Sequence, residues 1–118
     1  MPVPVIHFEI GASNTGKSKE FYSELFDWSF QTFEGTDYHL VGPAGEKSIG
    51  GGLGATPDGQ PPYLTLYALV DDLQKYLDKA ESLGGKTILK PTPIPGVGSC
   101  AMFTDPDGII IGLFKGQE

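Results

Sequence analysis

The first segment of the chain alternates between apolar and polar residues, which predicts a β-strand. Ile6, Phe8 and Ile10 form a strongly apolar row, and His7 and Glu9 lie between them. Successive side chains of a strand point to opposite faces of a sheet. We therefore expect the apolar row to pack on a helix, and His7 and Glu9 to point toward a cavity on the other face.

Further along the chain, the apolar spacing changes twice to the period of a helix. A stripe of aromatic and leucine residues predicts a helix over about 15–26. A second stripe, capped by Asp71 and ended by Gly84 and Gly85, predicts a helix over about 73–83. One strand precedes each helix and three follow it. The expected strands cover about residues 5–10, 28–33, 38–41, 48–53, 63–70, 87–89, 99–104 and 109–115.

This order of elements occurs twice, which predicts a duplicated βαβββ unit and an α+β fold. The stretch Phe8-Glu9-Ile10 corresponds to Tyr67-Ala68-Leu69, and the turn GPAG corresponds to the later turn DPDG. One helix would cover one face of each sheet, and the opposite faces would form a shared concave, barrel-like cavity in a mixed sheet. The predicted bounds are 1–55 for the first module, 56–62 for a linker rich in glycine and proline, and 63–118 for the second module.

The composition narrows the class of partner. The 118 residues suffice for one domain with a hydrophobic core. Eight basic and fifteen acidic residues give a formal net charge of −7, which argues against nucleic acid or an anionic membrane as a partner. The apolar runs are far too short for a membrane span, and the N-terminus does not resemble a secretory signal. We therefore expect a soluble, cytoplasmic protein.

Four stretches spread over the whole chain point to one known superfamily. They read VIHFEI, EFYSELFDWSF, VDDLQKYLDKAESLGG and MFTDPDGIIIGLF. In this order they resemble the vicinal oxygen chelate superfamily, which contains glyoxalases, bleomycin-resistance proteins and extradiol dioxygenases. The resemblance implies a pseudo-symmetric cavity and a small-molecule ligand. It also implies that modules pair within one chain or across two chains, and we expect a homodimer.

The resemblance further implies up to four metal ligands, which are His or Glu side chains from the first and last strand of each module. Transferred residue by residue, these positions fall on His7, Leu66, Gly112 and the stretch 49–52. Of these, His7 alone carries a donor atom, and a divalent cation needs several converging donors. We therefore predict no metal and no cofactor. A metal-dependent lyase or dioxygenase, with its ligands at other positions, stays open as an alternative.

His7 and Glu9 are the candidate catalytic residues. A histidine beside a carboxylate can act as a general base with an orienting group, or as a polar anchor for a ligand. His39 is instead expected to be a partly exposed strand residue. The other wall of the expected cavity is apolar, which favours a small hydrophobic or aromatic ligand. The residues expected to line the cavity are Val5, Leu64, Leu66, Ala68, Ile110, Gly112 and Phe114.

A competing motif runs from Gly11 to Ser18. It reads GASNTGKS and matches the phosphate-binding pattern G-x-x-x-x-G-K-[ST] in full. In such a loop, backbone N–H groups and Lys17 bind phosphates, and Ser18 binds Mg²⁺. The predicted runs of three strands joined by short turns indicate antiparallel pairing, whereas these nucleotide-binding enzymes need a parallel sheet. A nucleotide binder is therefore kept as a second alternative.

Overall fold

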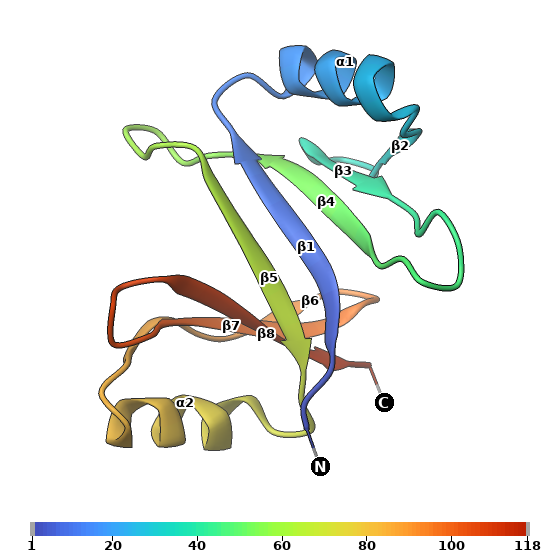
Figure 1. Ribbon diagram of the computed structural model, residues 1–118. Coiled ribbons are helices and arrows are strands. Elements are labelled where there is room, and N and C mark those ends of the chain that lie inside the picture. The colour runs from blue at the N-terminus through green and yellow to red at the C-terminus, as the bar shows by residue number, and fades with distance from the viewer. Residues whose placement is uncertain (1, 118) are drawn as a thin grey trace. The chain divides into compact units, whose positions relative to one another are not determined.

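The computed structural model describes residues 2–117, which form two helices and eight strands (Figure 1). His7–Leu64 is one compact unit, called the first unit below. The described residues before and after this range form the second unit. The α+β class, with two helices and mixed parallel and antiparallel strand pairing, is confirmed. Within the described residues, neither helix is long and apolar enough to cross a lipid bilayer.

The elements of the first unit follow the order strand, helix and three strands. In space the strand order is β2-β3-β4-β1. β4 pairs with β1 in parallel, and β3 pairs antiparallel with both β4 and β2. The parallel pair requires a crossover connection, which contains α1. The elements are β1 (Val5–Ala12), α1 (Thr15–Phe26), β2 (Phe30–Thr32), β3 (Tyr38–Val41) and β4 (Gly50–Ala55).

The second unit repeats this topology. Its strand order is β5-β8-β7-β6, with β5 and β8 parallel and the other neighbours antiparallel. Two strands cross the boundary between the units: Val5 and Ile6, the first residues of β1, belong to the second unit, and Tyr63 and Leu64, the first residues of β5, belong to the first unit. The elements are β5 (Tyr63–Leu69), α2 (Leu73–Ser82), β6 (Lys86–Ile94), β7 (Gly98–Thr104) and β8 (Ile110–Gly116).

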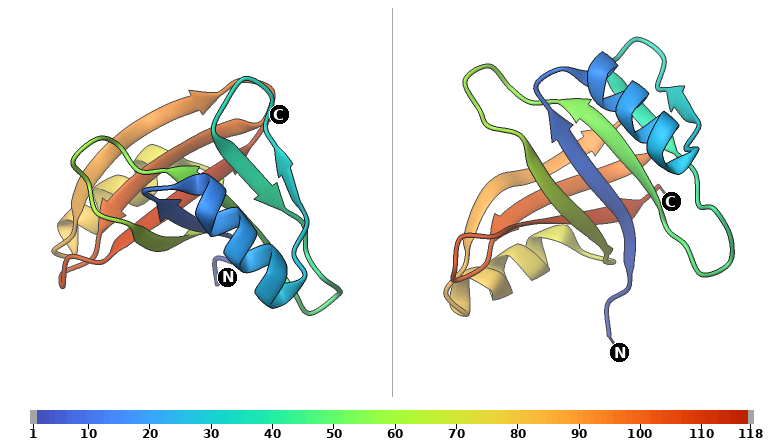
Figure 2. Two further views of the ribbon diagram at one scale, coloured as in Figure 1. Left: turned by 90° about the horizontal axis from the view of Figure 1, so that it is seen from above. Right: turned by 45° about the horizontal axis from the view of Figure 1, so that its top comes forward.

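In the second unit, α2 lies along one face of its sheet (Figure 2). The hydrophobic core of this unit lies between the two. The helix begins after Asp72, whose side chain accepts a 3.1 Å hydrogen bond from the backbone N–H of Lys75. The predicted cap, Asp71, is therefore one residue too early. The amphipathic stripe buries the side chains that face the sheet, because burial of apolar surface stabilises the packed helix. The buried core consists of Val70, Leu73, Leu77, Ala101 and Leu113.

In the first unit, aromatic rings connect α1 with its sheet. The Trp28 ring lies 5.5 Å from the Tyr22 ring of α1 and 5.6 Å from the Phe8 ring of β1, measured between centroids. A side chain at Gly51 would collide with the Phe8 ring, so the absence of a side chain at this position makes room for the ring. Phe8 therefore faces α1. His7 and Glu9, its neighbours in β1, point to the opposite face of the sheet.

Candidate functional site

The face of the first unit that points away from α1 carries a hydrogen-bonded cluster around Glu9. The Glu9 side chain is buried, with 8% of the residue exposed. Tyr38 donates a 3.0 Å hydrogen bond from its hydroxyl to Oε1, and Tyr63 donates one of 2.6 Å to Oε2. Nε2 of His7 lies 2.9 Å from the Tyr38 hydroxyl. We call His7, Glu9, Tyr38 and Tyr63 the Glu9 cluster.

Two glycines make room for the tyrosine rings of this cluster. Gly52 lies opposite Glu9 in the β1–β4 pair, and a side chain there would collide with the Tyr38 hydroxyl. A side chain at Gly11 would collide with the Tyr63 ring. Sequence analysis identified His7 and Glu9 but missed both tyrosines. A glycine inside a strand often marks the close approach of another group. The glycines were therefore the one signal in the sequence that could have pointed to bulky side chains at this place.

The cluster fixes the proton positions of its members. Burial lowers the pKa of His7 below its ordinary value of 6.5, and the nearby Glu9 carboxylate opposes this shift without reversing it. The imidazole is therefore neutral at pH 7. Because Tyr38 gives its only proton to Glu9, Nε2 of His7 donates to the Tyr38 oxygen, and Nδ1 is the acceptor atom of the ring.

Tyr63 is held in its protonated form. Burial raises its pKa well above the ordinary value of 10.0, and the hydrogen bond to Glu9 and the charge of that carboxylate act in the same direction. The hydroxyl is therefore a permanent donor to Glu9. Together, the four side chains present a neutral imidazole beside a carboxylate that two hydroxyls hold in place. Such an arrangement can accept a hydrogen bond from a ligand or remove a proton from it.

The second unit shows which residues occupy the equivalent positions. The helix caps Asn14 and Asp72 each follow their strand, and the residues seven positions before them are His7 and Thr65. The expected counterpart of His7 was Leu66. The helix caps place the counterpart one position earlier, at Thr65. The Thr65 side chain is buried and donates a 2.6 Å hydrogen bond to the backbone carbonyl oxygen of Ile110.

This one-residue difference reverses the face on which the residues of β5 lie. Ala68 was expected to line a cavity, but it packs against the core beneath α2. Leu66 alternates in step with Ala68 and shares that helix-covered face. Val5 and Leu64 are exposed. The expected residues of β8 alternate with the core residue Leu113 and lie on the face away from α2: Ile110, Gly112 and Phe114.

The strand registers extend the comparison between the units. Glu9 lies opposite Gly52 in the first unit, and Tyr67 lies opposite Gly112 in the second. A side chain at Gly112 would collide with the Tyr67 ring, just as one at Gly52 would collide with Tyr38. In both units, the last strand thus carries a glycine opposite a residue of the first strand. A tyrosine ring occupies the space that a side chain at this glycine would fill.

A family model matches the amino-acid sequence over nearly the whole chain. The model describes the Glyoxalase/Bleomycin resistance protein/Dioxygenase superfamily and matches residues 5–113. The chain belongs to this superfamily. Solved structures support the fold of the superfamily at low sequence identity. Methylmalonyl-CoA epimerase from Mycobacterium tuberculosis is 15% identical, with a TM-score of 0.67 over 97% of this chain and 88% of the epimerase. The Mn(II)-bound glyoxalase from Novosphingobium aromaticivorans is 17% identical, with a TM-score of 0.64 over 94% of this chain and 38% of the glyoxalase.

Relatives with similar amino-acid sequences are named either as anthracycline biosynthesis proteins or as putative glyoxylases. The anthracycline biosynthesis protein DnrV of Streptomyces peucetius is 27% identical over 125 residues, which cover 92% of this chain and 45% of DnrV. The putative glyoxylase CFP32 of Mycobacterium tuberculosis (strain CDC 1551 / Oshkosh) is 33% identical over 98 residues, which cover 80% of this chain and 37% of CFP32. The chain thus spans less than half the length of these relatives.

The donor set of the Glu9 cluster does not fit a metal centre. Both Glu9 oxygens accept tyrosine hydrogen bonds, and Gly52 on the neighbouring strand offers no donor atom. A transition metal needs several nitrogen, oxygen or sulfur donors that converge on one point. Among residues 2–117, no group of three or more His, Cys, Asp or Glu side chains is placed to hold a metal ion.

The phosphate-loop motif is divided between two regular elements. Gly11 lies near the end of β1, where it pairs with Gly54 of β4. Lys17 and Ser18 lie inside α1. The side chain of Asn14 accepts a 3.0 Å hydrogen bond from the backbone N–H of Lys17. A phosphate cradle needs such N–H groups for its ligand. The N–H of Lys17 is instead bonded to the side chain of the helix cap, Asn14. The glycine at position 11 makes room for the Tyr63 ring, so it does not need a phosphate-binding role.

His39 differs from its expected position, because it is buried, with only 6% of the residue exposed. Its Nε2 lies 2.8 Å from Oδ1 of Asp37, and its Nδ1 lies 2.8 Å from the Thr32 hydroxyl. Asp37 also accepts a 2.9 Å hydrogen bond from the Thr15 hydroxyl. The hydrogen bond from His39 is the main cause that lowers the pKa of Asp37 below 3.8. His39 therefore connects two strands with the first turn of α1.

Proposed function

We propose that the chain binds a small, partly apolar aromatic molecule through the Glu9 cluster, without a metal. The observation that carries this proposal is the buried Glu9 carboxylate held by the hydroxyls of Tyr38 and Tyr63. Burial of a charged group is unfavourable unless hydrogen bonds compensate for it, so such a group is commonly retained for a role. The two tyrosine rings bring apolar surface to the same place. A hydroxyl group on the ligand would join this hydrogen-bonded cluster, and the aromatic body would lie against the tyrosine rings.

The names of the relatives support an aromatic ligand with oxygen substituents. Two of them, DnrV and DauV, are named for anthracycline biosynthesis, at 27% and 26% identity. Anthracyclines are fused-ring aromatic compounds with hydroxyl and carbonyl groups. A hydroxylated anthraquinone has the same combination of a flat apolar body and hydrogen-bonding edges. This class of molecule fits a binding face made of tyrosine rings, a carboxylate and an imidazole.

A direct test compares 2,6-dihydroxyanthraquinone, whose hydroxyls are too far from the ring carbonyls to bond them, with anthraquinone, which lacks both hydroxyls. NMR titration of the labelled protein should show tighter binding of the dihydroxy compound, with shifts at Glu9 and its neighbours. In Glu9→Gln and Tyr38→Phe, its affinity should fall about tenfold, because a hydrogen bond to a charged group is lost or weakened. Tyr22→Phe and Glu24→Gln, which change the same residue types on α1, should bind as the original chain does. Equal affinity for both compounds, or unaffected binding in Glu9→Gln, would refute the proposal.

A second candidate function is proton transfer on the bound molecule. The observation that favours it is the His7 imidazole next to Glu9, which burial keeps in its neutral, basic form at pH 7. The α-protons of an aromatic ketone such as 1-tetralone then exchange with D2O: His7 removes the proton from carbon, the enolate takes a deuteron from D2O, and the imidazolium returns its proton to the deuteroxide that remains. His7→Gln should abolish this exchange. Activity that EDTA removes would instead favour the metal-dependent lyase or dioxygenase.

A further inference from the structure

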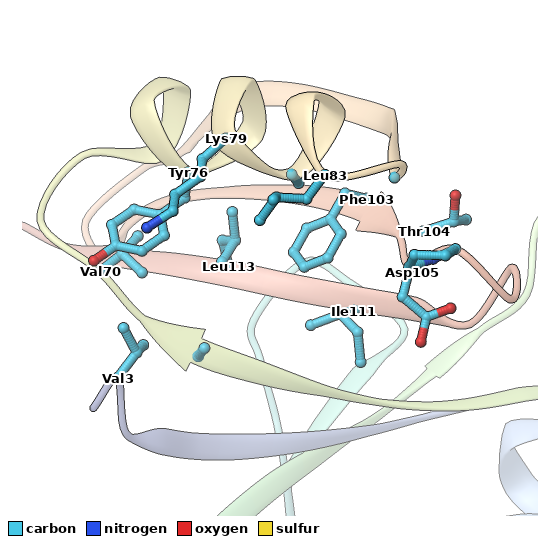
Figure 3. Close-up of a pocket in the computed structure, with 14 residues that line it drawn as sticks. Val3, Val70, Tyr76, Lys79, Leu83, Phe103, Thr104, Asp105, Ile111 and Leu113 are labelled. Atoms are coloured by element: carbon cyan, nitrogen blue, oxygen red, sulfur yellow. The ribbon is translucent and has the colours of Figure 1, made fainter. Parts of the chain in front are cut away.

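The second unit contains an apolar groove of about 400 Å³ on the α2 side of its sheet (Figure 3). This groove lies on the opposite face of that sheet from Gly112 and Phe114. Side chains of α2 form one wall, and strands β7 and β8 form its base. The apolar and aromatic residues that line it include Val3, Tyr76, Leu83, Phe103 and Ile111. A volume of this size is typical of pockets for small molecules.

The groove exists because α2 covers only part of the sheet. Leu73 and Leu77 are buried against the core, and they account for the helix stripe that packs on the sheet. Leu83, which follows the helix, is 69% exposed, although it lines the groove. Phe103 and Tyr76 are only partly buried beside the core. The apolar surface left in the groove is unfavourable in water, and a bound apolar group would remove it from solvent.

The charged groups lie at the ends of the groove. Figure 3 shows Tyr76 and Lys79 at one end and Asp105 at the other. Asp105 is already engaged, because Oδ1 accepts 2.9 Å hydrogen bonds from the backbone N–H groups of Asp107 and Ile109. Among the described residues, Lys79 forms no ion pair within 4 Å. The ammonium group of Lys79 is therefore the charge that can attract a ligand.

We propose that this groove binds a small amphipathic anion, with an aromatic or aliphatic body against Phe103, Ile111 and Leu83 and an anionic head at Lys79. The Tyr76 hydroxyl, at the same end, is a second donor for the head. The concave shape and volume suit a single small molecule. The site shares no residue with the Glu9 cluster, so the two proposals stand or fall separately.

The test uses 2-naphthalenesulfonate and 2-naphthol, which share an apolar body but differ in charge at pH 7. Methyl NMR of the full chain should show shifts at Leu83, Ile111 and Leu113 with both probes, and tighter binding of the sulfonate. Leu83→Asp should weaken the binding of the sulfonate about tenfold or more, because it places a carboxylate in the apolar wall. Lys79→Gln should weaken it about tenfold and leave 2-naphthol unchanged.

Two matched variants serve as controls. Leu25→Asp changes a leucine of α1 that is 57% exposed and lies as far beyond its helix cap as Leu83 does. Lys75→Gln changes a lysine of α2 that does not line the groove. Both should bind the sulfonate as the original chain does. The proposal is overturned if the groove methyls do not shift, or if Lys79→Gln has no effect on the sulfonate. It is equally overturned if sedimentation shows a dimer that Leu83→Asp dissociates, because the groove would then hold a second copy of the chain.

Discussion

The Tyr63 hydroxyl donates a 2.6 Å hydrogen bond to Oε2 of Glu9, a residue 54 positions earlier in the chain. This bond connects the start of β5 with the middle of β1 inside the first unit. It supplies one of the two tyrosine hydrogen bonds that keep a buried carboxylate satisfied. The second hydrogen bond comes from Tyr38 in β3. This strand pairs with β4, which in turn pairs with β1.

Tyr63→Phe should lower the free energy of unfolding by about 1–3 kcal/mol, because a buried carboxylate loses a donor. Urea unfolding followed by circular dichroism measures this change. The matched control is Tyr22→Phe, in the same unit, whose hydroxyl makes no hydrogen bond with the other described residues. That control should stay within about 0.5 kcal/mol of the original chain. Equal values for the two variants would contradict the role assigned to Tyr63.

His7 should titrate below its ordinary pKa of 6.5, because burial disfavours the imidazolium ion. As the pH falls below 6.5, the unfolded chain takes up a proton at His7 before the folded chain does. The free energy of unfolding therefore decreases from pH 6.5 down through the lower folded pKa, and His7 adds nothing further below it. NMR titration of the imidazole Cε1–H gives the midpoint directly. His7→Gln should remove this part of the pH dependence, and a midpoint at or above 6.5 would contradict the prediction.

Gly52→Ala should destabilise the first unit by about 1–3 kcal/mol, since the added methyl group collides with the Tyr38 hydroxyl. Gly45→Ala is the matched control, because a side chain there meets nothing within 4 Å. A double-mutant cycle with Tyr38→Ala identifies the cause. The combined loss should be smaller than the sum of the two single losses, because Tyr38→Ala removes the colliding group. Strictly additive losses would show that Gly52 acts through something other than Tyr38.

Asn14→Ala should cost about 1 kcal/mol of stability, because the side chain that caps α1 is lost. Ser13→Ala, the exposed neighbour, should change little. Asp72→Ala removes the corresponding cap of α2 and should have a similar effect. The free energies come from urea unfolding of all three variants. If Mg-ATP stabilised the chain and Lys17→Ala removed that stabilisation, the segment would bind phosphate and the capping assignment would be wrong.

Local patterns in the sequence were sufficient for the fold. The period-two row of Ile6, Phe8 and Ile10 indicated the strand and its faces, and the helical stripes indicated α1 and α2. The match of the two modules was less reliable, because it paired Phe8-Glu9-Ile10 with Tyr67-Ala68-Leu69 and did not use the helix caps to set the register. Asp72 is such a cap: counting back from it finds Thr65 rather than Leu66. An error of one residue exchanges the two faces of a strand, which explains the misplacement of Ala68.

The candidate site was predictable only in part. His7 and Glu9 are two positions apart on one strand, so alternation alone placed them together. Tyr38 and Tyr63 reach Glu9 through strand pairing and through the chain after β4, and no local pattern reports such contacts. The burial of His39 was not predictable from its position in a strand, because it accompanies hydrogen bonds to Thr32 and Asp37 that the alternation pattern does not report. The module bounds, the homodimer and the cytoplasmic location stay predictions.

The aromatic cluster beneath α1 has an optical consequence. Trp28 is the single tryptophan of the chain, and its ring lies within 5.0 to 5.6 Å of those of Phe26, Tyr22 and Phe8. Its emission therefore reports the first unit alone, whereas far-ultraviolet circular dichroism sums over both units. If the units unfold as one, the two denaturation curves superimpose, and if they unfold separately, the emission curve follows the first unit only. The duplicated architecture thus carries a natural fluorophore in one half, which makes the coupling between the halves measurable without any label.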